Sequence, residues 1–423
     1  MKQLIIYLLL FCHLKSYCVV NVTLVDAMRF AKESSHSLKS AEQRLNSSSK
    51  NELSTFLKFG PSVSFSWNDT WDATKKITQE DSTNVGSFKL TQSVSGLWKN
   101  YSNFKNSSIL NFIANQNFMD AEQKSELLGA TSYLNYQLAL EQLAISKASL
   151  KTSEKNYSDS NTKYIAGDLN KDEFLKIKLQ YSKNLQDLST AENNVIVVKQ
   201  SMCLVIGISN CDEVTVENLK VEKFLNKVNF HFEDLKSALE KSFKKNTVLL
   251  ISQAKIEQAD LNKSVTLNSY VPDVSVFADY ETYFHSPQSI NDTKTAGVTL
   301  SWNFFDSGSQ FFKFLANRSD ALAAREDLEA NKIDLQKEVI FKYYEFNNYF
   351  NTIQIAKNNE ETTYETLNLE AIRFENGQIS ALEYVTAQDN YNSALANLVQ
   401  TAINFQVSYL TFQTLLGDTP KLE

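Results

Sequence analysis

Few residues of this 423-residue chain are arranged for chemistry. The four histidines, His13, His36, His231 and His285, are scattered without the spacing of metal ligands. The sequence has no glycine-rich phosphate loop and no nucleophile elbow, and its carboxylates lie mostly where helix faces are expected. The sequence therefore predicts no metal, no cofactor and no enzymatic activity.

Two cysteines, Cys203 and Cys211, are close together in the sequence and remain after the N-terminal segment is removed. In an oxidising compartment such a pair can form a disulfide that closes a small structural loop. Two free buried thiols are the alternative.

The N-terminal segment indicates export from the cytoplasm. Lys2 is followed by a nearly continuous apolar run over residues 4–11, which is shorter than the ~20 residues of a membrane-spanning helix. Small residues at the −3 and −1 positions place cleavage near Val19, so residues 1–18 are expected to be a signal peptide. Lipidation of Cys18 is the competing interpretation, although the residues before it fit a lipoprotein signal poorly.

The composition favours long helices. Only 10 glycines and 4 prolines occur, and residues 62–271 and 288–419 contain no proline. Because proline is the strongest helix breaker, long helices are permitted and a turn-rich sandwich is disfavoured. A charged fraction of 22% beside a hydrophobic fraction of 43% argues against disorder. The net charge of −7, without a basic patch, argues against a nucleic-acid partner.

The sequence matches itself at a shift of 210 residues, which places Gly167 on Gly377 and Gly207 on Gly417. Internal repetition of this kind indicates a duplicated structural unit. The expected arrangement is a first repeat at 19–210, a join at 211–229 and a second repeat at 230–423.

Each repeat is expected to contain two long helices. Matching apolar residues recur at spacings of three, four and seven, which form a narrow seam on a helix as in coiled coils. The expected helices are 97–163, 170–206, 309–374 and 380–416. The seam alone leaves a plain antiparallel coiled coil as an alternative.

Each repeat also contains two stretches that alternate apolar and polar residues, as in a strand with two different faces. The expected strands are 61–67, 86–95, 272–281 and 296–305, with loops at 68–84 and 282–295. Their length suits tilted membrane strands of about 9–11 residues. Four strands cannot close a membrane barrel, for which about eight is the smallest class. Either several chains share a barrel, or the strands form a small soluble sheet that caps the helices.

Five short motifs, in order along nearly the whole mature chain, resemble the TolC-like outer-membrane efflux proteins. They are Thr23–Ala27, Tyr270–Val274, Val298–Gly308, Arg373–Ile379 and Leu415–Gly417. The resemblance implies a mainly α fold with a small β part, built as a homotrimer. Its 12-strand β-barrel in the outer membrane would continue as a 12-helix α-barrel through the periplasm. It implies a duct for efflux or type I secretion, supplied by a periplasmic adaptor and an inner-membrane RND or ABC transporter. A periplasmic structural coiled coil without channel activity is the alternative.

The resemblance also assigns a tunnel mouth to the two glycine turns. Acidic residues of the family correspond to Glu173 and Glu383, which follow Gly167 and Gly377 by six residues. Rings of such carboxylates would favour cations. The turns, expected at Ala166-Gly167-Asp168-Leu169 and Asn376-Gly377-Gln378-Ile379, would also dock the adaptor.

The closing bonds of the family are expected to differ here. Tyr164 and Phe374 precede the glycines by three residues, and Phe374 lacks a hydroxyl that some members use. Thr386 stands where a further acidic residue is found. A capping role competes with gating, because Ser380 and Glu383 fit a capping box.

Overall fold

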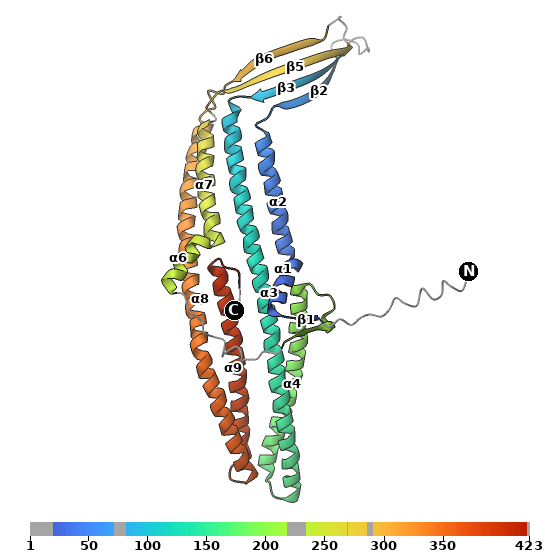
Figure 1. Cartoon of the computed structure of the whole chain (residues 1–423), viewed down its shortest axis with the longest axis vertical. Coiled ribbons are helices and arrows are strands. Elements are labelled where there is room, and N and C mark those ends of the chain that lie inside the picture. Colours follow the sequence, from blue (N-terminus) through green and yellow to red (C-terminus); the bar gives the residue numbers. More distant parts are fainter. Residues whose placement is uncertain (1–19, 72–81, 218–233, 269, 286–290, 421–423) are drawn as a thin grey trace, which may run out of the picture. The chain divides into compact units, whose positions relative to one another are not determined.

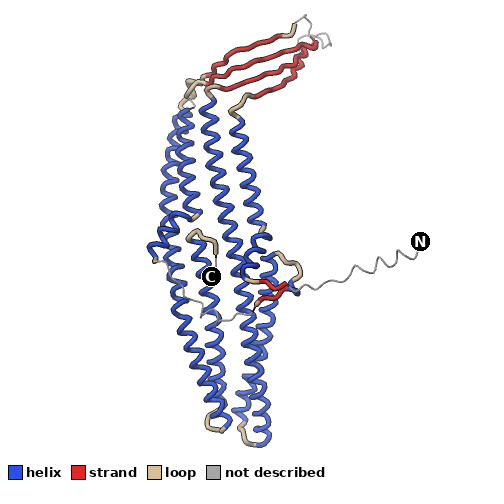
Figure 2. Tube along the Cα trace, in the orientation of Figure 1, coloured by secondary structure: helices blue, strands red, loops and turns tan. Residues whose placement is uncertain are grey.

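The structure is a computed structural model that describes residues 20–71, 82–217, 234–268, 270–285 and 291–420. Helices make up most of these residues, and the strands are few (Figure 2). The chain divides into two compact units. Unit 1 comprises Met1–Leu38, Ala121–Lys245 and Leu335–Glu423, and unit 2 comprises Lys39–Asp120 and Asn246–Asp334. The expected signal peptide, Cys18 and most of the join at 211–229 lie outside the described residues.

One series of elements, two shorter helices, two strands and two long helices, occurs twice along the chain (Figure 1). The first series is α1 Leu24–Ser34, α2 His36–Leu57, β2 Ser62–Trp71, β3 Ser82–Ser93, α3 Gly96–Ala166 and α4 Lys171–Ile206. The second is α6 Leu235–Lys245, α7 Thr247–Asn268, β5 Asp273–His285, β6 Thr293–Ser301, α8 Ser309–Glu375 and α9 Ala381–Leu415.

The observed bounds differ from the expected ones mainly at the strands. The helix α3 has 71 residues and α8 has 67, as the lack of proline allows. The strands β2 and β5 extend into the segments expected as loops, because cross-strand pairing continues past the alternating stretch. In contrast, β6 ends at Ser301, four residues before its expected end.

The four strands of unit 2 form one antiparallel sheet in the order β2-β3-β5-β6. Phe65 pairs with Phe88, which pairs in turn with Tyr280, and Val276 pairs with Val298. A register shift interrupts the β3–β5 ladder between Asn84 and Val85. The outer edges of β2 and β6 have no partner strand among the described residues of the chain.

The sheet has an apolar face and a polar face, since neighbouring residues of a strand point to opposite sides. The register brings these side chains to the apolar face: Val63, Phe65, Trp67, Phe88, Leu90, Val276, Ala278, Val298 and Leu300. The polar face carries Ser64, Ser66, Ser87, Lys89, Asp279, Glu281 and Thr299. The apolar residues are exposed, at 71% for Val63 and 67% for Val298. A soluble capping sheet would bury such a face, so this alternative does not fit the structure.

Polar contacts connect the helices of unit 2 in the same order as the strands. Asn111 of α3 donates to Glu52 of α2 at 2.7 Å. Gln258 of α7 donates to Asn106 of α3 at 3.0 Å. The guanidinium of Arg325, on α8, forms an ion pair with a carboxylate of α7. Each strand is thus directly joined to one helix of a row in the order α2-α3-α7-α8.

A hydrophobic core in unit 1 joins α1 to the middle of α3 and the end of α4. Ala27, Leu134, Met202 and Ile206 are among its buried members. A two-stranded parallel sheet, β1 Val20–Val22 with β4 Val214–Val216, lies at the same core.

The Cys203–Cys211 pair forms a disulfide in this core. It joins the last turn of α4 to the 3₁₀ turn Cys211–Glu213, which leads directly into β4. Two free thiols, the alternative from the sequence, are therefore not found.

Gly129 of α3 allows α1 to approach closely. A Cβ atom at this position would lie 2.5 Å from the Ala27 carbonyl oxygen and 2.6 Å from the Ala31 Cβ. Only glycine has no atom at this point, so the contact between the two helices depends on this residue.

We expect Gly129→Val to lower the free energy of unfolding by about 1–3 kcal/mol, because the added side chain overpacks the contact with α1. Leu128→Val is the matched control, since Leu128 is exposed and precedes Gly129 on the same helix. Denaturant unfolding followed by circular dichroism measures both. Equal midpoints for the two variants would show that α1 does not approach α3 at Gly129.

Candidate functional site at the helix turns

The two turns expected at the tips have the same backbone structure. Gly167 and Gly377 have positive φ angles of 86° and 69°. After each, a backbone N–H returns to the last turn of the helix: Asp168 N donates to Lys163 O, and Gln378 N to Arg373 O, both at 2.8 Å. These are Schellman motifs, in which glycine ends a helix by adopting the left-handed conformation. A Cβ atom at either glycine would meet nothing within 4 Å, so the glycines serve the backbone turn.

The helices that follow begin with capped N-termini. Asn170 accepts a hydrogen bond from the Glu173 N–H at 2.8 Å. Ser380 and Glu383 form a reciprocal capping box, in which the Glu383 carboxylate accepts from the Ser380 N–H at 2.8 Å and from its hydroxyl at 3.0 Å. The capping pattern of the second turn is thus confirmed.

The capping box changes the acidity of Glu383. The backbone N–H of Ser380, and secondly its hydroxyl, lower the pKa of the Glu383 carboxyl, because both hydrogen bonds favour the charged form. The stabilisation is therefore present above the ordinary pKa and is lost as the pH falls through the lowered value. Glu383 remains charged at neutral pH while it caps the helix.

A stacked aromatic pair closes each hairpin above its turn. Tyr164 stacks on Phe174 with a centroid distance of 4.7 Å, and Phe374 stacks on Tyr384 at 5.1 Å. The two pairs are equivalent under the 210-residue shift, but the hydroxyl is on the opposite ring. In the second hairpin the hydroxyl that Phe374 lacks is therefore supplied by Tyr384.

Two contacts join the second hairpin to the first near the turns. Asn156 of α3 donates through Nδ2 to the Tyr384 hydroxyl at 3.2 Å. The Lys163 ammonium lies 5.6 Å from the centroid of the Phe374 ring, within range of a cation–π interaction. Because both rings belong to one stacked pair, the two contacts hold the same point of the second hairpin.

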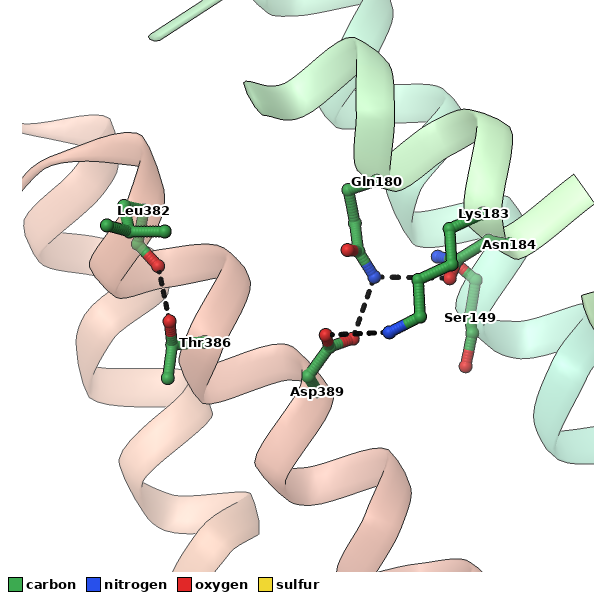
Figure 3. Close-up of polar contacts among 7 residues, drawn as sticks. All are labelled: Ser149, Gln180, Lys183, Asn184, Leu382, Thr386 and Asp389. Atoms are coloured by element: carbon green, nitrogen blue, oxygen red, sulfur yellow. Dashed lines mark hydrogen bonds and ion pairs between the residues drawn. The ribbon is translucent and has the colours of Figure 1, made fainter. Parts of the chain in front are cut away.

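A third and stronger contact lies further along α9, at Asp389 (Figure 3). Its carboxylate accepts from Gln180 Nε2 at 2.7 Å and from Lys183 Nζ at 3.1 Å, both on α4. Gln180 also donates to Asn184, which donates to the Ser149 carbonyl of α3. Gln180 and Asn184 are buried. A charge-assisted network of this kind connects three helices at one level.

Thr386 does not take part in this network. Its hydroxyl donates to the Leu382 carbonyl of its own helix at 2.7 Å (Figure 3). The structure thus adds Asp389 to the contacts between the hairpins, a residue that sequence reasoning did not select. The expectation that the closing bonds differ from those of the family stays a prediction. The sequence did contain a signal for Asp389. Under the 210-residue shift it corresponds to Leu179, so a charged residue of the second repeat takes the place of an apolar residue of the first.

The described residues contain no group of three or more histidine, cysteine, aspartate or glutamate side chains that could hold a metal. None of the described helices is long and apolar enough to cross a membrane.

Residues 239–418 match the family model described as outer membrane efflux protein. The second half of the chain thus matches the outer membrane efflux proteins in sequence. The match indicates a transport protein of the outer membrane, and not an enzyme. No curated protein matches the sequence.

Several solved channel structures share the fold of this chain. CusC has a TM-score of 0.81 at 14% identity, with 95% of this chain and 93% of that chain covered. The Campylobacter jejuni CmeC outer membrane channel has a TM-score of 0.77 at 13% identity, covering 95% and 87%. The open state of the Neisseria gonorrhoeae MtrE outer membrane channel has a TM-score of 0.79 at 14% identity, covering 94% and 89%.

Proposed function

We propose that three copies of this chain form the exit duct of a tripartite efflux pump or of a type I secretion system. The twelve strands close one barrel in the outer membrane, and the long helices continue it as a twelve-helix α-barrel in the periplasm. Substrate comes from an inner-membrane RND or ABC transporter, through a periplasmic adaptor that docks on the turns at 166–169 and 376–379. Each chain contributes two repeats, 19–210 and 230–423, joined by 211–229 after removal of the signal peptide 1–18.

The observation that carries this proposal is the sheet of unit 2. Its apolar face is exposed, and its edges at β2 and β6 lack partners among the described residues. In lipid, each unpaired backbone group costs several kcal/mol, so the edges must pair with other chains. Three chains give twelve strands and two give eight. A periplasmic coiled coil would leave both the face and the edges unexplained.

The contacts between the hairpins support a closed state of the tunnel mouth. Asn156–Tyr384 and Lys163–Phe374 hold the second hairpin near its turn, and the Asp389 network holds it further along. We infer that α8 and α9 move away from α3 and α4 when the mouth opens, so these contacts must break. Glu173 and Glu383 then lie at the mouth as carboxylates that attract cations.

The double variant Glu173→Gln, Glu383→Gln is expected to lower the cation-to-anion permeability ratio several-fold in planar bilayers, because it removes the charges at the mouth. Reversal potentials in a salt gradient measure this ratio. The control is Glu240→Gln, Glu326→Gln, which removes two exposed charges on α6 and α8, away from the turns. Equal reversal potentials for the two double variants would assign Glu173 and Glu383 to capping alone.

The duct with Asp389→Asn is expected to have a conductance several-fold higher than that of the wild type. The reason is that Lys183 loses its charged partner, so the second hairpin is held less tightly. The control is Asp172→Asn, which removes an ion pair of similar length, to Lys176 at 2.6 Å, but within one helix. Single-channel recording compares the two. If both variants conduct like the wild type, the Asp389 network does not hold the mouth closed.

A further inference from the structure

We propose that the Cys203–Cys211 disulfide holds the N-terminal end of the mature chain in place, so that this end docks only after the two thiols have been oxidised. The segment concerned is β1 with α1, residues 20–34, which we call the N-terminal clasp (Figure 1). With the thiols reduced, the N-terminal clasp opens far more often, while the long helices remain folded. The inference goes beyond the proposed duct, because the residues that carry it belong to unit 1 and none lies in the four-stranded sheet or at the turns.

The first attachment of the N-terminal clasp is the parallel pairing of β1 with β4. Among the described residues, β4 is the only strand that pairs with β1. Val22 of β1 and Val214 of β4 are both buried in the core of unit 1. Since β1 directly follows the cleavage site expected near Val19, no earlier element of the mature chain would hold it, and its position depends on that of β4.

The second attachment lies at the end of α1. The Ser34 hydroxyl donates to the Val205 carbonyl, in the last turn of α4, at 2.7 Å. Gly207 makes this approach possible, because a Cβ atom there would lie 2.5 Å from the Ser34 Cβ. With 11 residues, α1 is too short to be a stable helix alone in water, so it depends on these attachments and on its contact with Gly129.

The disulfide fixes β4 against α4. Cys203 lies in the last turn of α4, and Cys211 begins the 3₁₀ turn that leads directly into β4. Both cysteines are buried, and their Cα atoms are 5.8 Å apart. Beyond the far end of β4, Gln137 of α3 donates to the Glu217 carbonyl at 2.9 Å. Without the disulfide, the near end of β4 is joined to α4 only through the connecting loop, and the partner strand of β1 is less firmly placed.

The second repeat uses a different contact at the corresponding place. It lacks the cysteine pair, because Gln413 and Lys421 stand at those positions under the 210-residue shift. Its short helix α6 is instead held beside the end of α9 by ion pairs from Asp418 to Lys241 and Lys245, at 2.6 and 2.9 Å. In addition, α6 is preceded by the rest of the chain, whereas the N-terminal clasp has a free end. A covalent bond is therefore found in the repeat that has the free end.

Closing the disulfide is an oxidation. The thiols of Cys203 and Cys211 lose two electrons and two protons, and the Sγ–Sγ bond forms. The acceptor is the disulfide of a periplasmic thiol oxidase, which breaks by thiol–disulfide exchange and takes up the electrons and protons as two thiols. Because thiols are kept reduced in the cytoplasm, the N-terminal clasp closes after export.

Hydrogen–deuterium exchange of the full mature chain in detergent, followed peptide by peptide with mass spectrometry, tests this inference. The oxidised chain is compared with the same chain after phosphine reduction and with the variant Cys203→Ala, Cys211→Ala. Without the bond, exchange in residues 20–34 is expected to be about tenfold faster or more, since a disulfide typically stabilises by at least this factor. Exchange in residues 336–350 of α8, in the same unit, is expected to be unchanged.

The matched control is Ile206→Val, which shortens a buried side chain of the same core and keeps the bond. In the oxidised state, this variant is expected to exchange like the wild type in residues 20–34. If it exchanges as fast as the reduced chain, packing and not the bond holds the N-terminal clasp, and the inference is wrong.

Three further outcomes would overturn the inference. Unchanged exchange in residues 20–34 after loss of the bond would show that β1 docks without it. Equally faster exchange in residues 336–350 would show that the bond stabilises the whole core and not the N-terminal clasp. Thiols that react with iodoacetamide in the chain purified from membranes would show that the bond does not form. None of these outcomes bears on the proposed duct, which the bilayer recordings test separately.

Discussion

Backbone hydrogen bonding at the edges of the four-stranded sheet constrains the rest of the assembly. The strands β2 and β6 each present one side to no partner among the described residues, while the apolar face next to them is exposed. Water would form hydrogen bonds with the edges of the sheet but would leave its apolar face in contact with solvent. Lipid would cover the apolar face but would leave the backbone groups at the edges unpaired. Further copies of the same chain, in lipid, satisfy both. In the proposed assembly, each chain supplies four strands to a shared barrel, two from each repeat.

The sequence predicted the fold well wherever one physical effect dominated. The lack of proline and the seam of three- and four-residue spacings predicted α3, α4, α8 and α9, and alternation predicted the four strands. Strand ends were less predictable, since pairing partners decide them. Trp302 and Phe304 continue the alternation of Val298 and Leu300, yet the strand ends at Ser301. At Trp302 and Phe304 the alternating pattern therefore marks large exposed apolar side chains, and not residues that pair with a neighbouring strand.

The candidate site was only partly predictable. Glycine at 167 and 377 and the cap at Ser380 follow from local backbone chemistry, which a sequence reveals directly. The Asp389 network depends on which faces of α4 and α9 meet, and this is a property of the packed helices. Its partners, Gln180 and Lys183, are separated from Asp389 by about half the chain and have no local signature. The resemblance to outer-membrane efflux proteins predicts where the mouth lies, and the structure supplied these contacts.

A disulfide between β2 and β6 of different chains tests the shared barrel most directly. Ser64→Cys on β2 is combined in turn with Thr295→Cys, Gly297→Cys or Thr299→Cys on β6. Within one chain these edges are about 14 Å apart, across three strand spacings, too far for a disulfide, whose Cα atoms lie at most about 7 Å apart. Closure by three chains predicts that one of the pairs yields covalent trimers on oxidation in membranes. Monomers in every case, or covalent dimers alone, would contradict a barrel built from three chains.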